Sequence, residues 1–572
     1  MLSAMANVVT LEPETLLTDS AASSILPEHS GTELLIALAI FLFACVYLWP
    51  LRDFTSFNAD EGITLCGADR ILRGQVPYRD YFSFVTPGSQ YLMAFWFKLF
   101  GTSFVVARSV LLVYAGIFGG MTYFLGRRLY SRSTALFSAA LLVLGCMPFR
   151  LLAIHNWDST LFAVLAIYCS QRALETPSSP WWFCVGFTAA ATCLTEQSKG
   201  VGVLLGLGIA ALLLLLPPRK RWPDSFAKLG WAAMGFMIPL TVTFAYFASQ
   251  HAMKAMLAAW FWPLRHYSVV NRVTFGWVPI SAHDLHDMFS SGTLWQRALI
   301  AFFSAPMILI STLALLVIAT TVYSIVTRCN AAPSRALDVR VVGGSVFFGT
   351  FLATLATGRA DTHHLLYLMP LCMYLVPSIL DVKHPSMRSV YRMRSLVAGL
   401  LLFSFTGFGL VTLLNALSHP TRTETRRGTV RFGYPDEVLR YVRSNVAEGQ
   451  PLYIHPYQPF YTFMTGTINP THFEFLFPGM NTRAQSESVI QDLAADRTPV
   501  VLLDPRFAAD KVPDTWPSVS LAALAVDPVE DYILRHYRTC RFLNLNPQQL
   551  WSFYYMVRND MQCPVSAGRA TW

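Results

Sequence analysis

Long apolar stretches recur along this 572-residue chain and limit its possible folds more than any other feature. A stretch of about 20 apolar residues is long enough to cross a bilayer as a helix. Charged residues make up 13% of the chain, roughly half their share in a soluble domain. The sequence therefore predicts an α-helical polytopic membrane protein. Eleven spans are expected, at 33–50, 104–125, 133–149, 158–172, 181–196, 201–217, 229–249, 298–327, 341–357, 364–380 and 395–416.

The loops between the spans indicate an orientation. With the N-terminus inside, the short inner loops, such as 218–228, are dense in Lys and Arg, and the outer loops are sparser. This distribution follows the positive-inside rule, so we interpret the net charge of +9 as topogenic and expect no nucleic-acid partner. The polar tail 1–32 has no Lys or Arg and is therefore not expected to be a signal peptide. The loops 51–103 and 250–297 are predicted to lie outside.

The segments predicted to lie outside show regular patterns. Loop 51–103 contains two amphipathic stretches that are typical of helices lying in the membrane interface. The tail 417–572 alternates helix and strand patterns, with strands predicted at 451–457 and 498–504. We therefore expect a transmembrane domain over 33–416, followed by a small extracytoplasmic α/β domain.

Two of the ten cysteines, Cys540 and Cys563, lie in this polar tail. They could pair if the tail faces an oxidising compartment, and they could equally remain free thiols. Most of the others lie in apolar spans and are interpreted as small buried side chains.

Ionisable residues gather in four places, all at the outer ends of predicted spans, where such groups are usually functional. The first is the pair Asp60 and Glu61. Adjacent carboxylates can hold an acceptor hydroxyl or amine and take its proton, or they can favour a helix start, and both readings stay open. The second is "HNWDS", where His155 and Asp158 could bind a sugar or assist proton transfer. Taken alone, this cluster favours an N-cap by Asp158 with Trp157 as an interface anchor.

The third cluster is "TEQSKG" and the fourth is "GRADTHH". Lys199 is flanked by predicted helix ends, which favours phosphate binding over snorkelling with Glu196 as its partner. Arg359 can bind a phosphate through two hydrogen bonds. His363 and His364 can bind phosphate or metal, but they lack a clear third ligand, so no metal site is expected. The alternative for the fourth cluster is a charged cap on a helical hairpin.

Together, the four clusters place acids, cations and imidazoles at one face of the membrane. An enzyme acting on a lipid phosphate needs such groups at the headgroup plane. A transporter more often buries them near mid-span and shows a repeat between its halves, so a transporter or lipid-linked-sugar flippase is the alternative. Phosphoethanolamine and acyl transferases are disfavoured, because the tail shows no metal-ligand or nucleophile cluster.

The first outer loop carries the motifs "DEG", "GQVPYRD", "FSFVTPG" and "FGTS". These motifs resemble the GT-C superfamily of membrane glycosyltransferases, closest to its protein O-mannosyltransferase-like and aminoarabinose-transferase-like group. The resemblance covers about residues 33–380. It implies transfer of a sugar from a polyprenyl-phosphate donor to a protein, lipid or glycan acceptor, with inversion and with no required cofactor. It also implies a bacterial inner membrane, with the active site outside and the N-terminus in the cytoplasm.

The resemblance also assigns roles to individual residues. It makes Asp60 the catalytic base and Glu61 its catalytic neighbour. Relatives often have a Lys-Gln pair where this chain has "TEQSKG", which is a departure at Lys199. Four side chains are expected to hold the donor phosphate: Lys199, Arg359, His363 and His364. Four others are expected to bind the acceptor or the sugar: Arg79, Asp80, His155 and Asp158.

Overall fold

The computed structural model describes residues 31–564 apart from short segments. These segments are 177–178, 216–225, 279–285, 287–289, 291, 328–334, 381–392, 420, 433–435, 478, 525 and 545–550. The predicted polar tail 1–32 therefore lies almost wholly outside the described residues, as does most of the basic inner loop 218–228.

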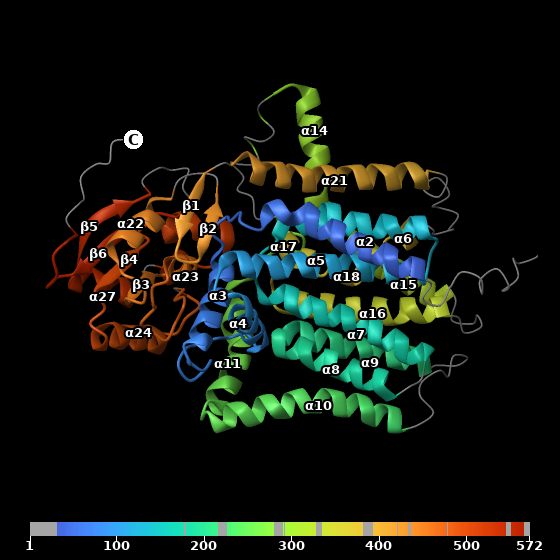
Figure 1. Ribbon diagram of the computed structural model, residues 1–572, viewed down its shortest axis with the longest axis horizontal. Coiled ribbons are helices and arrows are strands. Elements are labelled where there is room, and N and C mark those ends of the chain that lie inside the picture. The colour runs from blue at the N-terminus through green and yellow to red at the C-terminus, as the bar shows by residue number, and fades with distance from the viewer. Residues whose placement is uncertain are drawn as a thin grey trace, which may run out of the picture.

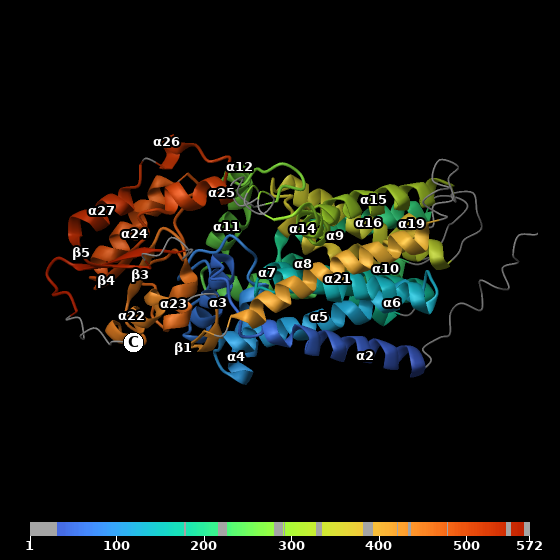
Figure 2. The same ribbon diagram turned by 90° about the horizontal axis from the view of Figure 1, so that it is seen from above.

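Long helices lying side by side form most of the molecule, and a smaller C-terminal domain lies at one end of them (Figure 1). A view turned by 90° shows the same division (Figure 2). Eight described helices are long and apolar enough to cross a membrane, as expected for a polytopic fold. They are α2 (Gly31–Leu48), α5 (Phe104–Arg127), α6 (Arg132–Ala140, continued by η2 and η3 to Arg150), α9 (Gln197–Leu215), α10 (Phe226–Ser249), α15 (Pro306–Thr327), α16 (Arg335–Ala356) and α21 (Arg394–Ser418).

Three of the eleven predicted spans match none of these eight, and a fourth, 298–327, matches only in part, because α14 (Leu294–Ser304) is a separate helix before α15. Two of the three fall on α7 (His155–Glu175), which carries charged side chains near both ends, and on the 17-residue α8 (Ser179–Thr195). Both pack in the same bundle. The third, 364–380, is not one helix, because Pro370 and Pro377 lack the N–H that a helix interior needs. It is divided into α17 (Thr362–Leu366), α18 (Met369–Cys372), η4 (Met373–Leu375) and α19 (Pro377–Leu380).

Glycines let several of these helices approach closely. A Cβ added at Gly186 on α8 would lie 1.9 Å from the carbonyl oxygen of Ala232 on α10. A Cβ added at Gly206 on α9 would lie 2.4 Å from the Cα of Val346 on α16. Membrane helices gain van der Waals contact through such small residues. The pairs α8–α10 and α9–α16 are therefore fixed at short distance.

Loop 51–103 forms α3 (Ala59–Leu72) and α4 (Gly88–Phe100), in the two stretches expected to be helical. The side chain of Asn58 caps α3 by accepting a 3.2 Å hydrogen bond from the backbone N–H of Glu61. Helix α11 (Met253–Arg265) lies beside α3 and α4, between the bundle and the C-terminal domain (Figure 1). The first turn of α3 is therefore placed at the junction between the two parts of the molecule.

The C-terminal domain is built on a four-stranded sheet in the order β3-β4-β6-β5. Strand β3 (Leu452–His455) runs parallel to β4 (Val500–Leu503), while β6 (Phe553–Arg558) is antiparallel to both β4 and β5 (Tyr537–Leu543). The sheet is accompanied by α22 (Glu437–Asn445), α23 (Pro459–Thr465), α24 (Arg483–Ala495) and α27 (Pro528–His536), and a hairpin of β1 (Arg422–Thr425) and β2 (Gly428–Arg431) precedes it. The predicted C-terminal sheet region is thus confirmed. Of the two alternatives for Cys540 and Cys563, the structure has the disulfide.

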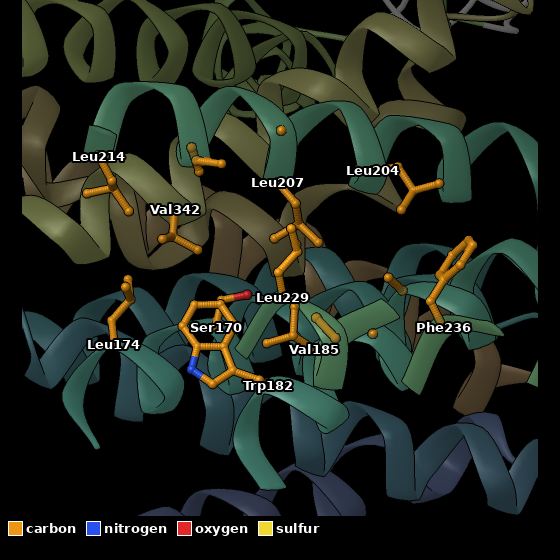
Figure 3. Close-up of a pocket in the computed structure, with 16 residues that line it drawn as sticks. Ser170, Leu174, Trp182, Val185, Leu204, Leu207, Leu214, Leu229, Phe236 and Val342 are labelled. Carbon is orange, nitrogen blue, oxygen red and sulfur yellow. The ribbon is translucent and has the colours of Figure 1, made fainter. Parts of the chain in front are cut away.

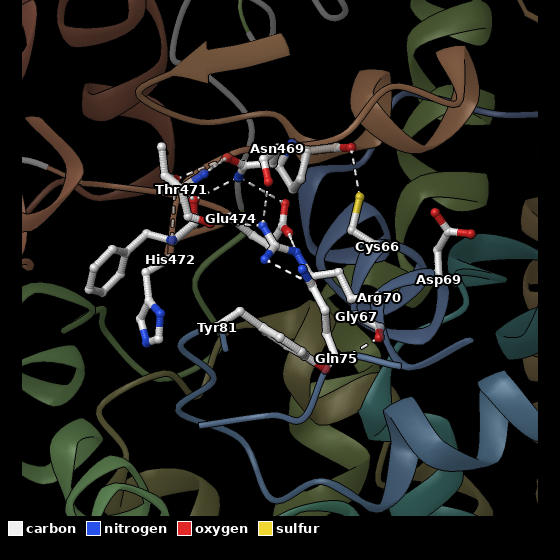
Figure 4. Close-up of polar contacts among 12 residues, drawn as sticks. Cys66, Gly67, Asp69, Arg70, Gln75, Tyr81, Asn469, Thr471, His472 and Glu474 are labelled. Carbon is white, nitrogen blue, oxygen red and sulfur yellow. Dashed lines mark hydrogen bonds and ion pairs between the residues drawn. The ribbon is translucent and has the colours of Figure 1, made fainter. Parts of the chain in front are cut away.

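A buried ion pair holds the C-terminal domain against loop 51–103 (Figure 4). Arg70 of α3 pairs with Glu474, and both side chains are less than a tenth exposed. Its Nη2 also donates to the carbonyl oxygens of Asn469, at 3.1 Å, and Thr471, at 2.9 Å. Because a buried guanidinium needs such partners, these contacts hold α3 against the domain.

Candidate active site

The side chain of Asp60 lies at the junction of the bundle and the C-terminal domain. Asp60 is exposed and sits in the first turn of α3. Its Oδ1 accepts a 2.6 Å hydrogen bond from the hydroxyl of Tyr457, which belongs to the C-terminal domain and is only 8% exposed. Burial, and then the charge of Asp60, raise the pKa of Tyr457 well above its ordinary value. The phenol therefore remains a hydrogen-bond donor to Asp60.

The neighbouring carboxylate, Glu61, points the other way and is fully buried. It accepts two hydrogen bonds from Arg108 of α5, at 2.6 and 2.8 Å, and a third from the backbone N–H of Ala153, at 2.8 Å. This bidentate pair ties α3 to α5 and to the segment that precedes α7. In the structure Glu61 therefore fixes the helix that carries Asp60, and its oxygens are engaged by protein donors.

Arg150 lies at the same end of the bundle, and the sequence analysis did not single it out. The η2 and η3 turns over Leu141–Arg150 complete the third long span and end at this residue. Its Nε donates a 2.9 Å hydrogen bond to the hydroxyl of Tyr367, and neither Nη has a protein partner among the described residues. A signal was available, because Arg150 is a single cation at the end of an apolar stretch, separated from "HNWDS" by only the four residues 151–154.

Electrostatic interactions connect Asp60 with groups from several elements. Its negative charge acts on Arg150, on His155 at the start of α7, on Tyr267 at the start of α12 (Tyr267–Val270) and on Tyr367. The end of the bundle thus gathers one exposed carboxylate, one arginine with uncommitted N–H groups, an imidazole and phenols. We call this set the junction site.

The "GRADTHH" cluster borders the junction site. Arg359 donates to Asp361 at 2.9 Å, to the side chain of Asn271 at 3.2 Å and to the carbonyl oxygen of Thr515 at 2.7 Å. The ring Nδ1 of His364 lies 2.8 Å from the other oxygen of Asp361. Burial alone would raise the pKa of Asp361, but His364 and Arg359 hold it well below its ordinary value. Arg359 therefore links this end of the bundle to the C-terminal domain.

His363 differs from its neighbour. Its ring lies 5.3 Å from that of Phe149, measured between centroids. Burial, and then the positive charge of Arg150, lower the pKa of His363 well below its ordinary value. The ring is therefore neutral near pH 7 and offers a hydrogen bond rather than a positive charge.

Lys199 is buried, and its ammonium protons donate hydrogen bonds to protein oxygens. Its Nζ donates to the carbonyl oxygen of Asn156, at 2.9 Å, to Ser159 Oγ, at 2.9 Å, and to Thr160 Oγ1, at 3.0 Å. A carboxylate oxygen of Glu196 lies 3.2 Å away. An ammonium has only three protons, so a phosphate at Lys199 would have to replace one of these partners. In this structure Lys199 joins the start of α9 to the start of α7.

The four residues expected to bind acceptor or sugar fall in different places. His155 belongs to the junction site, whereas Asp158, one turn later on α7, is buried. Arg79 and Asp80 form an exposed pair at 2.8 Å, and Arg79 also donates to Gln250 at 3.0 Å. No hydrogen bond or ion pair among the described residues joins the Arg79–Asp80 pair to Asp60. Within the described parts of the chain, no group of three His, Cys, Asp or Glu side chains could hold a metal ion.

Comparisons with known proteins place this architecture in context. A family model described as dolichyl-phosphate-mannose-protein mannosyltransferase matches residues 85–247. No curated protein sequence matches the chain. The structure is similar to that of ArnT from Cupriavidus metallidurans bound to undecaprenyl phosphate, with a TM-score of 0.51, 11% sequence identity, and coverage of 94% of this chain and 100% of that one.

Two other solved structures are similar at lower scores. The archaeal oligosaccharyltransferase AglB from Archaeoglobus fulgidus, in complex with an inhibitory peptide and a dolichol-phosphate, gives a TM-score of 0.48 at 11% identity and covers 93% of this chain and 75% of that one. The Pmt1-Pmt2 complex of S. cerevisiae gives 0.34 at 15% identity and covers 41% and 36%. The match to ArnT shows that this chain is a membrane protein with the GT-C fold. The resemblance found in the sequence is therefore confirmed at the level of the fold.

Proposed function

We propose that this protein is a membrane glycosyltransferase that moves a sugar from a polyprenyl-phosphate donor to a hydroxyl or amine acceptor. The observation that carries the proposal is the junction site, where the exposed carboxylate of Asp60 accepts a hydrogen bond from Tyr457 and interacts electrostatically with Arg150. The family-model match over residues 85–247 and the undecaprenyl phosphate bound to ArnT support this class of donor.

Asp60 is the general base of the proposed reaction. Tyr457 holds one of its oxygens, and the other is left for the acceptor. Asp60 takes the acceptor's proton as the acceptor oxygen or nitrogen forms a bond to the anomeric carbon. The bond from that carbon to the phosphate oxygen breaks, its electron pair leaves with the lipid phosphate, and the configuration inverts. Glu61 acts as a positioning residue through Arg108.

The departing phosphate needs positive charge more than it needs an acid. Arg150 supplies this charge most directly, because its Nη groups have no protein partner among the described residues. Arg359 and His364 border the same site, and His363 offers a neutral imidazole. Lys199 supports the donor phosphate by holding α7 and α9 together. Four further side chains are proposed to bind the acceptor or the sugar: Arg79, Asp80, His155 and Asp158.

The proposed location is a bacterial inner membrane, with the junction site and the C-terminal domain on the extracytoplasmic side. The disulfide between Cys540 and Cys563 supports an oxidising compartment for that domain. The eight long apolar helices would surround the polyprenyl chain of the donor.

A donor screen tests this function. The purified protein is incubated with radiolabelled polyprenyl-phosphate sugars and a membrane extract, and the label is followed from the lipid to other fractions. We expect transfer from at least one donor, with inversion of the anomeric configuration in the product. If no donor loses label while the same protein moves lipid-linked sugars across liposome membranes, the flippase alternative is correct.

A further inference from the structure

A second polar site lies at the end of the bundle opposite to the junction site. Helix α7 has 21 residues, which is about 30 Å at the rise of an α-helix, with His155 at one end and Glu175 at the other. At the Glu175 end, a cavity of about 290 Å³ lies between α7 and α16. Its lining includes Gln171, Glu175, Arg335 and Asp338 and is mainly polar.

The amide of Gln171 is the least expected feature of this cavity. Gln171 is only 2% exposed, and neither its Nε2 nor its Oε1 has a hydrogen-bond partner among the described residues. A buried amide without partners is costly, and native proteins usually satisfy such groups with protein, water or a ligand. An unpartnered donor and acceptor that line a cavity therefore point to a polar ligand.

The charges around the cavity favour an anionic group. Glu175 lies 2.9 Å from Arg128, 3.1 Å from Arg172 and 3.6 Å from Arg335. Three guanidinium groups face two carboxylates here, Glu175 and Asp338, so one positive charge is left in excess. The side chain of Arg335 is 41% exposed. Arginine binds phosphate well because its planar fork matches two oxygens.

An apolar cavity of similar size adjoins the polar one. It also has a volume of about 290 Å³ and lies between α7, α8, α9, α10 and α16. Figure 3 shows that its lining is almost entirely apolar and includes Trp182, Leu207, Leu229 and Phe236. Leu174 lines both cavities. A ligand could therefore place a polar head in one cavity and a hydrocarbon chain in the other.

The helices around the apolar cavity explain why a hydrocarbon chain would be needed in it. Helix α10 packs against α8 through glycines, but only 11% of its most apolar stretch is buried inside the protein. Leu229 on α10 and Leu204 on α9 both line the cavity, and they are 52% and 39% exposed. A hydrocarbon chain would fill the space between these helices and restore the contacts that an empty cavity forfeits.

We propose that the two cavities form a binding site for one glycerophospholipid of the leaflet farther from the junction site. The phosphate binds Arg335 and the amide of Gln171, and an acyl chain enters the apolar cavity beside Leu174. A polyprenyl-phosphate donor does not fit this role, because its phosphate must reach Asp60 at the other end of α7. The bound lipid would be a structural partner that joins α10 to α7 and α16.

Glycine variants give a sharp test. Gly208 lines the apolar cavity, and a Cβ added there would meet no heavy atom within 4 Å, so Gly208→Leu should fill the cavity without moving the backbone. Gly399 on α21 is equally open but lies outside the cavity, which makes Gly399→Leu a matched control. Lipid retained through purification in detergent is then extracted and identified by mass spectrometry.

We expect wild type and Gly399→Leu to retain a glycerophospholipid and Gly208→Leu to lose most of it. Gln171→Leu should weaken retention about tenfold, because a hydrogen bond to a charged phosphate is lost. Equal retention in Gly208→Leu and Gly399→Leu, or a polyprenyl phosphate as the lipid displaced by Gly208→Leu, would overturn the proposal. Sugar transfer is measured on the same samples. A lack of transfer in every sample would count against the proposed function alone, because lipid retention is scored separately.

Discussion

The hydroxyl of Tyr457 donates a 2.6 Å hydrogen bond to Asp60, across the junction between the C-terminal domain and loop 51–103. The two residues are 397 positions apart in the chain. A contact of this kind makes the C-terminal domain part of the proposed catalytic centre, because it orients the carboxylate that is to accept a proton.

Tyr457→Phe tests this contact. The variant removes the hydrogen bond that holds one oxygen of Asp60 in place. We expect kcat/KM to fall roughly tenfold, as for a lost hydrogen bond to a charged group. Tyr532→Phe, in the same domain, serves as the control and should leave kcat/KM unchanged. An unchanged kcat/KM in Tyr457→Phe would show that the contact does not orient the base.

Arg150→Gln should remove the principal charge at the leaving phosphate. Loss of a group that stabilises charge in the transition state typically costs about 10²-fold in kcat. We expect a loss of this order, mainly in kcat, with partial recovery in Arg150→Lys. Arg483→Gln, which removes an exposed guanidinium from α24, should have no effect. If Arg150→Gln retains full kcat, another cation must hold the phosphate.

Glu61→Gln should lower the free energy of unfolding. The variant leaves Arg108 buried without a charged partner, which typically costs about 3–5 kcal/mol. Unfolding in detergent should therefore begin under much milder conditions than in the wild type. Glu487→Gln breaks an exposed pair with Arg483 and should change the unfolding free energy by less than about 1 kcal/mol. A similar, small effect for both variants would contradict a structural role for Glu61.

The disulfide between Cys540 and Cys563 closes a loop with a sequence separation of 23. A cross-link over such a loop typically stabilises a fold by about 3 kcal/mol. We expect the double variant Cys540→Ser/Cys563→Ser to lower the thermal unfolding midpoint of the C-terminal domain. Reductant should lower it equally in the wild type and should have no effect on the variant. An effect of reductant on the variant would assign the change to some other thiol chemistry.

The elements that the sequence predicts well are those with a strong local signal. The buried strands at Leu452–His455 and Val500–Leu503 fall where the sequence pattern predicts strands. The segment 364–380 was predicted as one span because its composition is apolar. In the structure it is divided, because Pro370 and Pro377 interrupt the backbone hydrogen bonds of a helix. Apolar composition alone could not reveal the break.

The candidate site is less predictable, because each role depends on partners far away in the chain. Asp60 and Glu61 are adjacent and chemically alike. Glu61 is buried against Arg108, however, whereas Asp60 is exposed. Lys199 has the charge expected for phosphate binding, although protein oxygens use its protons. Arg150 was overlooked because a single arginine at the end of a span is ordinarily a topogenic charge.

The most direct test of the account is sugar transfer by Asp60→Asn and Asp60→Glu beside the wild type, with donor binding measured on the same preparations. The account predicts that Asp60→Asn binds the labelled polyprenyl-phosphate sugar as the wild type does but transfers almost none of it, while Asp60→Glu keeps partial activity. Asp531→Asn, on exposed α27, should transfer normally. Undiminished transfer by Asp60→Asn would contradict the assignment of Asp60 as the base.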